Sequence, residues 1–272
     1  MSDHPSDVPF EQPESLDATS LENTDPTATK NNAEDVTLIA PKSLSFGMGG
    51  SWIAHGFGLF TKSIGLWIAI TLAWSVVVWL SGLIPVIGSL IFSVLSPVFA
   101  AGYLLGCHEL EEGRKLRFGH LFAGFSNNVG QLILVGVLYM VGIVIAILPA
   151  LMFMEPSISA LVGTESAASM FSVDDFITIA LGLLLSIALM TPVFMGYWFA
   201  PALVVFHDQS ATEAMLSSFK GCLRNMGPFL LYGIILGFLS VLSVIPMGLG
   251  LIVLIPVIHA TLYASYRTIF TE

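Results

Sequence analysis

The stretch from Leu230 to Arg267 is 38 residues long and contains no Asp, Glu, Lys or Arg before its last residue. A single α-helix of this length would be about 57 Å long, because each residue adds about 1.5 Å. The hydrocarbon core of a bilayer is only about 30 Å thick. Proline and glycine interrupt helices, and the segment P-M-G-L-G (Pro246 to Gly250) lies near the middle. The stretch is therefore predicted to form two membrane spans that fold against each other.

The composition of the whole chain is typical of a polytopic membrane protein. Of its 272 residues, 55% are apolar and only 10% are charged, whereas soluble domains contain about 25% charged residues. The apolar runs predict an all-α membrane protein with six transmembrane helices. The predicted spans are 64–84, 86–106, 130–150, 176–206, 228–246 and 249–266. The fourth exceeds the length that a bilayer needs, so we expect it to tilt or to continue beyond the membrane.

Residues 1–45 are predicted to be a disordered acidic tail that precedes a six-helix transmembrane domain, residues 46–272. Residues 1–40 hold nine Asp or Glu and one basic residue, Lys30, so most of the net charge of −10 belongs to the tail. This segment is rich in Pro, Ser, Asp and Glu and cannot bury enough surface to offset its ordering entropy. It also lacks a basic region followed by an apolar run, so we expect no cleavable signal peptide.

The distribution of basic residues predicts the orientation in the membrane. Lys and Arg are enriched in cytoplasmic loops. All nine basic residues fall on one side of the six predicted spans: Lys30, Lys42, Lys62, Arg114, Lys115, Arg117, Lys220, Arg224 and Arg267. We therefore expect both termini in the cytoplasm. Cys107 and Cys222 lie beside these loops, where thiols stay reduced, so no disulfide is expected.

Three segments align without gaps around a glycine, namely Phe57 to Gly65, Phe122 to Gly130 and Phe219 to Gly227. An apolar run follows each glycine and reaches a proline 19 or 20 residues later: Pro85, Pro149 or Pro246. This spacing predicts three helical hairpins in a pseudo-threefold repeat, each with a short amphipathic helix, a span, a proline turn and a return span. The middle hairpin contains an extra segment of about 30 residues. The alternative is that membrane hairpins resemble one another without being repeats.

The short helices before the first and third hairpins have apolar side chains at helical spacing. These are Trp52, Ile53, Phe57 and Phe60 in the first, and Met215, Leu216, Phe219 and Leu223 in the third. Such amphipathic helices can lie in the cytoplasmic interface with their basic side toward lipid headgroups. A short connector packed on the helix bundle explains the same pattern equally well.

The predicted spans contain no Asp, Glu, Lys or Arg at depth, and His259 is the ionisable residue nearest the middle of a span. Intramembrane charges usually mark transport pathways. A neutral imidazole can instead donate to a backbone carbonyl, and the neighbouring Pro256 leaves one without its usual partner. We favour this structural role for His259 over a proton relay, and the sequence leaves both open.

The segment after the second span carries residue types that bind zinc: Cys107, His108, Glu109, Glu112 and His120. Their spacing matches no established zinc pattern, and three basic residues lie among them, so a charge-balanced loop is favoured. His207 and Asp208 are expected to end the fourth span and to cap the next helix. The chain has no hydrolase, phosphate-binding or dinucleotide motif and no basic nucleic-acid patch. We therefore predict no catalytic, cofactor or metal site and no nucleic-acid partner.

Several stretches resemble a family of uncharacterised multi-pass integral membrane proteins of proteobacteria. They include G-G-S-W-I-A-H-G-F-G-L-F, A-P-A-L-V-V-F-H-D, S-F-K-G-C-L-R-N-M-G-P-F-L-L-Y-G and Y-A-S-Y-R-T-I-F. The similarity covers about residues 46–270 and omits the tail. The resemblance implies a bacterial inner (plasma) membrane location, and it supplies no activity or catalytic residues.

These observations favour a non-enzymatic, membrane-organising protein. Its amphipathic helices and acidic tail are expected to engage membrane lipids, a protein partner or a second copy of the chain. The alternative is a transporter or channel for an apolar or neutral solute, because repeated, proline-broken spans can line a pathway. An intramembrane enzyme is disfavoured, since no pair of nucleophile and base can be proposed.

Overall fold

The computed structural model describes residues 37–84, 86–162 and 173–272, so residues 1–36 of the predicted tail lie outside the described part. Regular secondary structure in these ranges is helical, apart from an isolated β-bridge between Leu38 and Thr271. The elements are α1 (Met48–Thr61), α2 (Ile64–Gly82), α3 (Ile87–Glu111), the 3-10 helix η3 (Phe118–Ser126), α4 (Val129–Val162), α5 (Val173–Trp198), α6 (Ala200–His207), α7 (Ala211–Arg224), α8 (Met226–Val244) and α9 (Gly250–Phe270).

Among the residues that the structure describes, six segments are long and apolar enough to cross a membrane, which confirms the predicted number of spans. They are Ile64–Gly82, Ile87–Glu111, Val129–Phe153, Phe176–His207, Met226–Val244 and Gly250–Phe270. The predicted break in the last long apolar stretch is also confirmed, because α8 ends at Val244 and α9 begins at Gly250. Between them, Met247 and Gly248 adopt positive φ angles of 56° and 82°, a region that glycine enters without steric cost.

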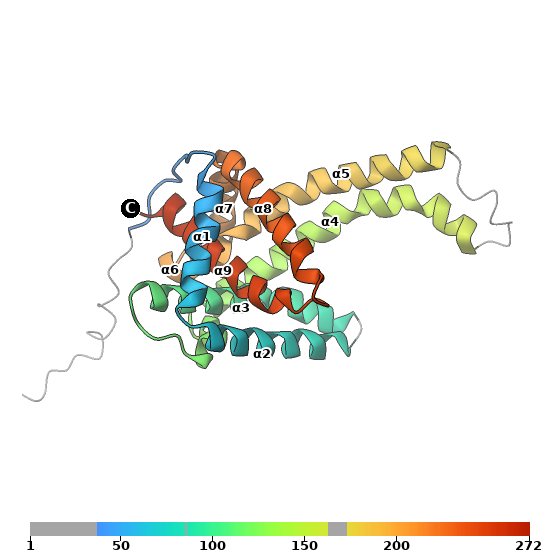
Figure 1. Cartoon of the computed structure of the whole chain (residues 1–272). Coiled ribbons are helices and arrows are strands. Elements are labelled where there is room, and N and C mark those ends of the chain that lie inside the picture. The colour runs from blue at the N-terminus through green and yellow to red at the C-terminus, as the bar shows by residue number, and fades with distance from the viewer. Residues whose placement is uncertain (1–36, 85, 163–172) are drawn as a thin grey trace, which may run out of the picture. The chain divides into compact units, whose positions relative to one another are not determined.

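Helices α3 and α9 form the core of the helix bundle. Half of the most apolar stretch of α3 and 61% of that of α9 are buried, against 22% or less in the other four spans. Helix α9 contacts α1, α2, α3 and α8 (Figure 1). A Cβ atom at Gly56 of α1 would lie 2.4 Å from Thr261 Cγ2 of α9, so the two helices meet at a distance that only glycine permits.

The middle hairpin differs from the prediction of a proline turn at Pro149, which is wrong. Helix α4 continues through Pro149 to Val162, and α5 begins at Val173, so most of the predicted extra segment extends these two helices. They run side by side beyond the other spans (Figure 1). Close to the proline, the Ala150 amide donates across the hairpin to Ser186 Oγ at 2.9 Å. Neighbouring helices can satisfy backbone groups near a proline in this way, which is compatible with a helix that continues through Pro149.

The predicted fourth span, 176–206, is interrupted at Phe199. Helix α5 ends at Trp198 and α6 begins at Ala200, with Pro201 in its first turn. The Phe199 amide donates to Ser218 Oγ of α7 at 2.9 Å, and that hydroxyl donates to the Met195 carbonyl at 2.6 Å. The α7 side chain therefore satisfies the backbone groups at the break and ties α7 to the end of α5.

The described part of the predicted tail, residues 37–45, is an extended segment bound to the C-terminal residues. The Ile39 and Lys42 amides donate to the Phe270 and Ile269 carbonyls, both at 2.9 Å. Asn225, which is fully buried, holds the same segment through Leu44 and Lys42. The acidic residues end at Asp35 and the apolar sequence T-L-I-A follows, which explains why this part packs against the bundle.

Candidate functional site

The basic side chains that the structure describes gather at one end of the helix bundle, which we call the basic end. It contains the C-terminal ends of α3 and α9, the loop after α3, and the junction of α7 with α8. Lys62 Nζ donates to the Leu110 carbonyl at the end of α3, at 3.1 Å, and Lys42 Nζ donates to the Thr271 carbonyl at 2.8 Å. The described basic residues are Lys42, Lys62, Arg114, Lys115, Arg117, Lys220, Arg224 and Arg267.

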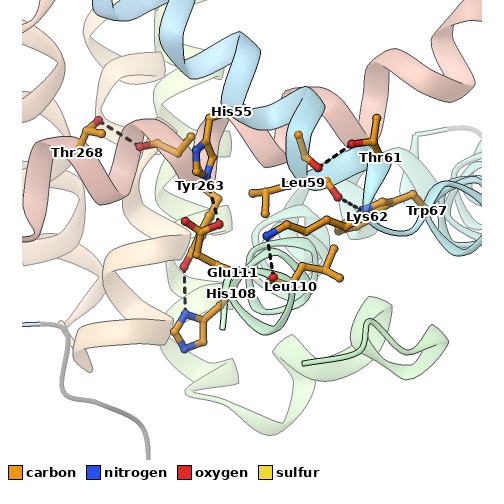
Figure 2. A network of polar contacts seen from close by, with 12 residues as sticks. His55, Leu59, Thr61, Lys62, Trp67, His108, Leu110, Glu111, Tyr263 and Thr268 are labelled. Atoms are coloured by element: carbon orange, nitrogen blue, oxygen red, sulfur yellow. Dashed lines mark hydrogen bonds and ion pairs between the residues drawn. The ribbon is translucent and has the colours of Figure 1, made fainter. Parts of the chain in front are cut away.

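A cleft of about 560 Å³ lies at the basic end between α1, α3 and α9. His55 Nε2 lies 3.2 Å from Glu111 Oε2 across it, and Figure 2 shows these side chains facing each other beside Lys62 and Leu110. Trp52 Nε1 donates to Thr268 Oγ1 at 2.8 Å. The Thr268 hydroxyl in turn donates to a carbonyl of its own helix, so it is held as a structural group. The polar lining residues are Lys42, Ser51, His55, Glu111, Arg267, Thr268, Thr271 and Glu272.

The zinc-binding residue types after the second span do not come together. His108 Nδ1 lies 3.0 Å from the Tyr263 hydroxyl (Figure 2), and Cys107 is fully buried. Glu109 accepts two hydrogen bonds from Arg114, at 2.9 and 3.0 Å. In the part of the chain that the structure describes, no three His, Cys, Asp or Glu side chains are placed to hold a metal ion.

Arg114 in the loop after α3 and His120 in η3 have shifted pKa values. The hydrogen bonds to Glu109 raise the pKa of the Arg114 guanidinium above its ordinary value. Burial lowers the pKa of His120, whose Nδ1 accepts the Arg117 amide hydrogen at 2.9 Å. A backbone amide can only donate, so this contact requires an unprotonated Nδ1 and therefore a neutral imidazole.

His259 lies inside α9, where its Nδ1 is 2.9 Å from the Ile255 carbonyl. The ring stacks on Tyr103 of α3, with centroids 4.2 Å apart and planes 20° apart. The predicted hydrogen bond to a backbone carbonyl is thus present. Its acceptor differs from the carbonyl that Pro256 leaves unpaired, because a proline frees the carbonyl four residues before it, at Ile252.

The residues at the end of the fourth span contact other elements rather than the helix that follows. His207 Nε2 lies 2.6 Å from the Tyr266 hydroxyl, and Asp208 Oδ1 accepts a hydrogen bond from Asn128. The predicted cap of α7 by His207 and Asp208 is wrong, because Ser210 is the N-cap. Ser210 Oγ accepts the Glu213 amide hydrogen while the Glu213 carboxylate accepts from the Ser210 amide, which is a capping box.

Helix α7 buries small residues and exposes large ones. Its inner face consists of Ala211, Ala214, Ser218, Gly221 and Cys222. On its outer face, Leu216 and Leu223 are 54% and 52% exposed, next to exposed Lys220 and Arg224. The other two residues of the predicted apolar face, Met215 and Phe219, are partly buried.

The two other short helices expose different faces. Helix α1 buries Trp52, Ile53 and Phe60 and contacts α8 and α9, so protein covers most of its predicted apolar face. The helix η3 follows three basic residues of the loop. It exposes Phe118, Phe122 and Phe125 by 40 to 46%, whereas Leu121 and Gly124 are buried.

An apolar groove of about 600 Å³ lies between α5, the end of α7 and α8. Its walls include Phe194, Trp198, Phe229, Leu230 and Leu236. The ring centroids of Trp198 and Phe194 are 4.9 Å apart. Cys222 also lines the groove, and burial raises the pKa of its thiol to about 12, which favours the protonated form.

A comparison with known proteins finds a distant relative. The chain is 27% identical to a probable inner membrane protein of the proteobacterium Burkholderia thailandensis over 243 residues, which is 80% of this chain and 89% of the relative. No protein-family model and no solved structure matches the chain significantly. The relative and the six apolar helices together support the predicted multi-pass inner-membrane protein.

Proposed function

We propose that this protein is a non-enzymatic, membrane-organising protein of the inner membrane that binds anionic lipid headgroups at its basic end. The observation that carries this proposal is the outer face of α7. There, Leu216 and Leu223 are exposed directly beside Lys220 and Arg224, which lie about 40° to 100° further round the helix. A helix with this arrangement can lie in the membrane interface, with leucine in the acyl region and cations at the headgroups.

The helix η3 supports the same function. Its exposed Phe118, Phe122 and Phe125 follow Arg114, Lys115 and Arg117, so aromatic and basic side chains again adjoin. Helix α4 contacts both η3 and α7, which places the two short helices around the same span. Aromatic side chains favour the membrane interface, and basic ones favour anionic lipid.

The order of the elements supports the three-hairpin repeat. Each of α1, η3 and α7 directly precedes a span, and the paired spans α2 and α3, α4 and α5, and α8 and α9 contact each other. The junction residues Ser63, Asn128 and Asn225 stand at equivalent positions, two residues before the aligned glycines. In this arrangement, each hairpin supplies one short helix at the basic end.

The orientation in this proposal has the basic end in the cytoplasm, together with both termini. Its support is that the eight described basic residues lie at that end and none of the described residues at the opposite end is basic.

The non-enzymatic character is supported by the polar groups of the cleft, because their partners lie within the protein. His55 Nε2 lies 3.2 Å from Glu111 Oε2, and Trp52 Nε1 donates to Thr268 Oγ1. The transporter alternative gains no comparable support, because the cleft opens at the basic end, the groove lies on α5 and α8, and His259 is stacked on Tyr103.

The lipid contact of α7 can be tested with nitroxide labels on Leu216→Cys, Leu223→Cys and Lys220→Cys in vesicles that contain phosphatidylglycerol. Cys107 and Cys222 are buried, so the added cysteine takes the label. We expect lipid-soluble oxygen to relax the labels at positions 216 and 223, and a water-soluble nickel chelate to relax the label at 220. Equal access of the nickel chelate to all three positions would contradict the proposal.

The cellular role can be tested with a chromosomal deletion. Dye permeability of the envelope and lipid composition are measured after complementation with the parent, with Leu216→Asp/Leu223→Asp, or with the control Ser217→Asp. We expect the deletion to change at least one of these properties, and only the double variant to fail in restoring it. A deletion that changes neither property would refute the membrane-organising role.

A further inference from the structure

The groove between α5 and α8 has no role in the proposal above. We propose that it binds one acyl chain of an anionic phospholipid from the leaflet at the basic end, while the headgroup lies beside the end of α7. This inference rests on the proposed function and names the lipid class and the place where it is held.

The groove has the size and chemistry of an acyl-chain site. Its volume of about 600 Å³ lies within the roughly 300–1,000 Å³ typical of ligand pockets. Aromatic and aliphatic side chains form its walls, with Trp198 and Phe229 on opposite helices. Trp198 contacts Phe229 and Tyr232 edge to face, at centroid distances of 6.4 and 6.2 Å, so this part of the wall is built of interlocking rings.

The groove is continuous with the surface that faces lipid in the proposed function. Its rim residues Phe194, Met226 and Leu230 are 44%, 59% and 61% exposed. The exposed stripe of α8 continues from Leu230 to Ile234 and Phe238. The rim by which a chain of the surrounding bilayer would enter the groove is therefore apolar.

Charge at the end of the groove favours an anionic headgroup. Met226 and Gly227 line the groove, and Arg224 precedes them by two and three residues. Arg224 and Lys220 form no ion pair with any residue that the structure describes, whereas Arg114 at the same end is paired with Glu109. Their charges thus remain available to a lipid phosphate.

Two glycines of α8 provide a matched test. Gly233 lines the groove, and a Cβ atom there would meet nothing within 4 Å, so Gly233→Leu places a side chain in the open space. Gly237 also has open space around it but is not among the groove-lining residues, so Gly237→Leu is the control. Both changes replace an exposed helical glycine and alter helix propensity equally.

The experiment is native mass spectrometry of the full-length protein released from nanodiscs that contain equal amounts of palmitoyl-oleoyl phosphatidylglycerol and phosphatidylcholine. We expect one retained phosphatidylglycerol on the parent and on Gly237→Leu, and loss of that lipid on Gly233→Leu. Lys220→Gln/Arg224→Gln should keep a lipid but lower the preference for phosphatidylglycerol by roughly fivefold per cation removed. The control Lys62→Gln removes a cation at the end of α1, outside the lipid-binding surface proposed around α4, and should retain the preference.

Equal lipid retention by Gly233→Leu and Gly237→Leu would overturn the proposal. So would a dimer in the parent that only Gly233→Leu abolishes, since the groove would then be a protein interface. If the nitroxide labels on α7 contact lipid while no lipid is retained in the groove, this inference fails and the proposed function stands. If a lipid is retained but the labels on α7 contact only water, the proposed function fails.

Discussion

The fully buried side chain of Asn225 permits a quantitative test of how the N-terminal segment is held. Its Oδ1 accepts the Leu44 amide hydrogen at 2.9 Å, and its Nδ2 donates to the carbonyls of Lys42 and Gly221 at 2.8 and 2.9 Å. Asn225→Ala removes the first two bonds, which join residues 42–44 to the bundle. An unpaired backbone group costs about 1–3 kcal/mol when it is buried. The Leu44 amide and the Lys42 carbonyl are only part-buried, so we take about 1–2 kcal/mol for each, and the segment should lose roughly 2–4 kcal/mol of local stability.

The assay is native-state hydrogen exchange followed by mass spectrometry in nanodiscs. Because about 1.4 kcal/mol corresponds to a tenfold change, the amides of residues 39–44 should exchange roughly 30- to 1,000-fold faster in Asn225→Ala. The control is Asn127→Ala, since Asn127 is exposed and its side chain donates only to the nearby Ala123 carbonyl. If both variants exchange at the parent rate in residues 39–44, Asn225 does not hold this segment and the reasoning is wrong.

Three further predictions follow from the packing and the pKa shifts. Gly56→Ala should lower the melting temperature in detergent, because the added Cβ would lie 2.4 Å from Thr261 Cγ2, whereas Gly58→Ala meets open space and should leave it unchanged or raise it. His120 is held neutral, so its contribution to loop stability is present above the ordinary pKa of about 6.5 and is lost as the pH falls through its lowered value. The intrinsic-rate-corrected exchange of residues 117–120 should therefore rise in acid, and His120→Gln should remove that dependence on pH. Cys222 should resist maleimide at pH 7.5 until the protein is denatured, because burial raises the pKa of its thiol to about 12; labelling of the folded protein within minutes would contradict this.

Sequence reasoning succeeded where a local pattern decides the outcome. The number of spans depends on the length and spacing of apolar runs, and the break between α8 and α9 depends on Pro246 and the glycines after it. At Pro149, the local rule that a proline ends a helix gave the wrong prediction. In lipid, neighbouring helices can satisfy backbone groups that a proline disturbs, and here Ser186 Oγ of α5 accepts the hydrogen of the Ala150 amide next to Pro149.

The candidate sites depend on contacts between residues far apart in the chain. The cleft at the basic end brings His55 against Glu111, and the groove brings Trp198 against Phe229. No periodicity within one helix predicts such pairs. The Asn225 contact had one available signal, because this residue stands at the repeat position that Ser63 and Asn128 also occupy, but its partners Lys42 and Leu44 were assigned to the tail.

The three short helices explain why lipid binding is expected on one side of the basic end. Helix α1 has glycines at positions 49 and 56 where it meets α8 and α9, so it approaches them closely and its apolar residues are buried. Helix α7 also has small residues on its inner face, but its large apolar residues Leu216 and Leu223 lie outside. Equivalent helices in a repeat thus serve different purposes according to which face carries the large apolar side chains. Since α4 contacts both α7 and η3, the lipid-binding surface should surround α4 and exclude the side covered by α1.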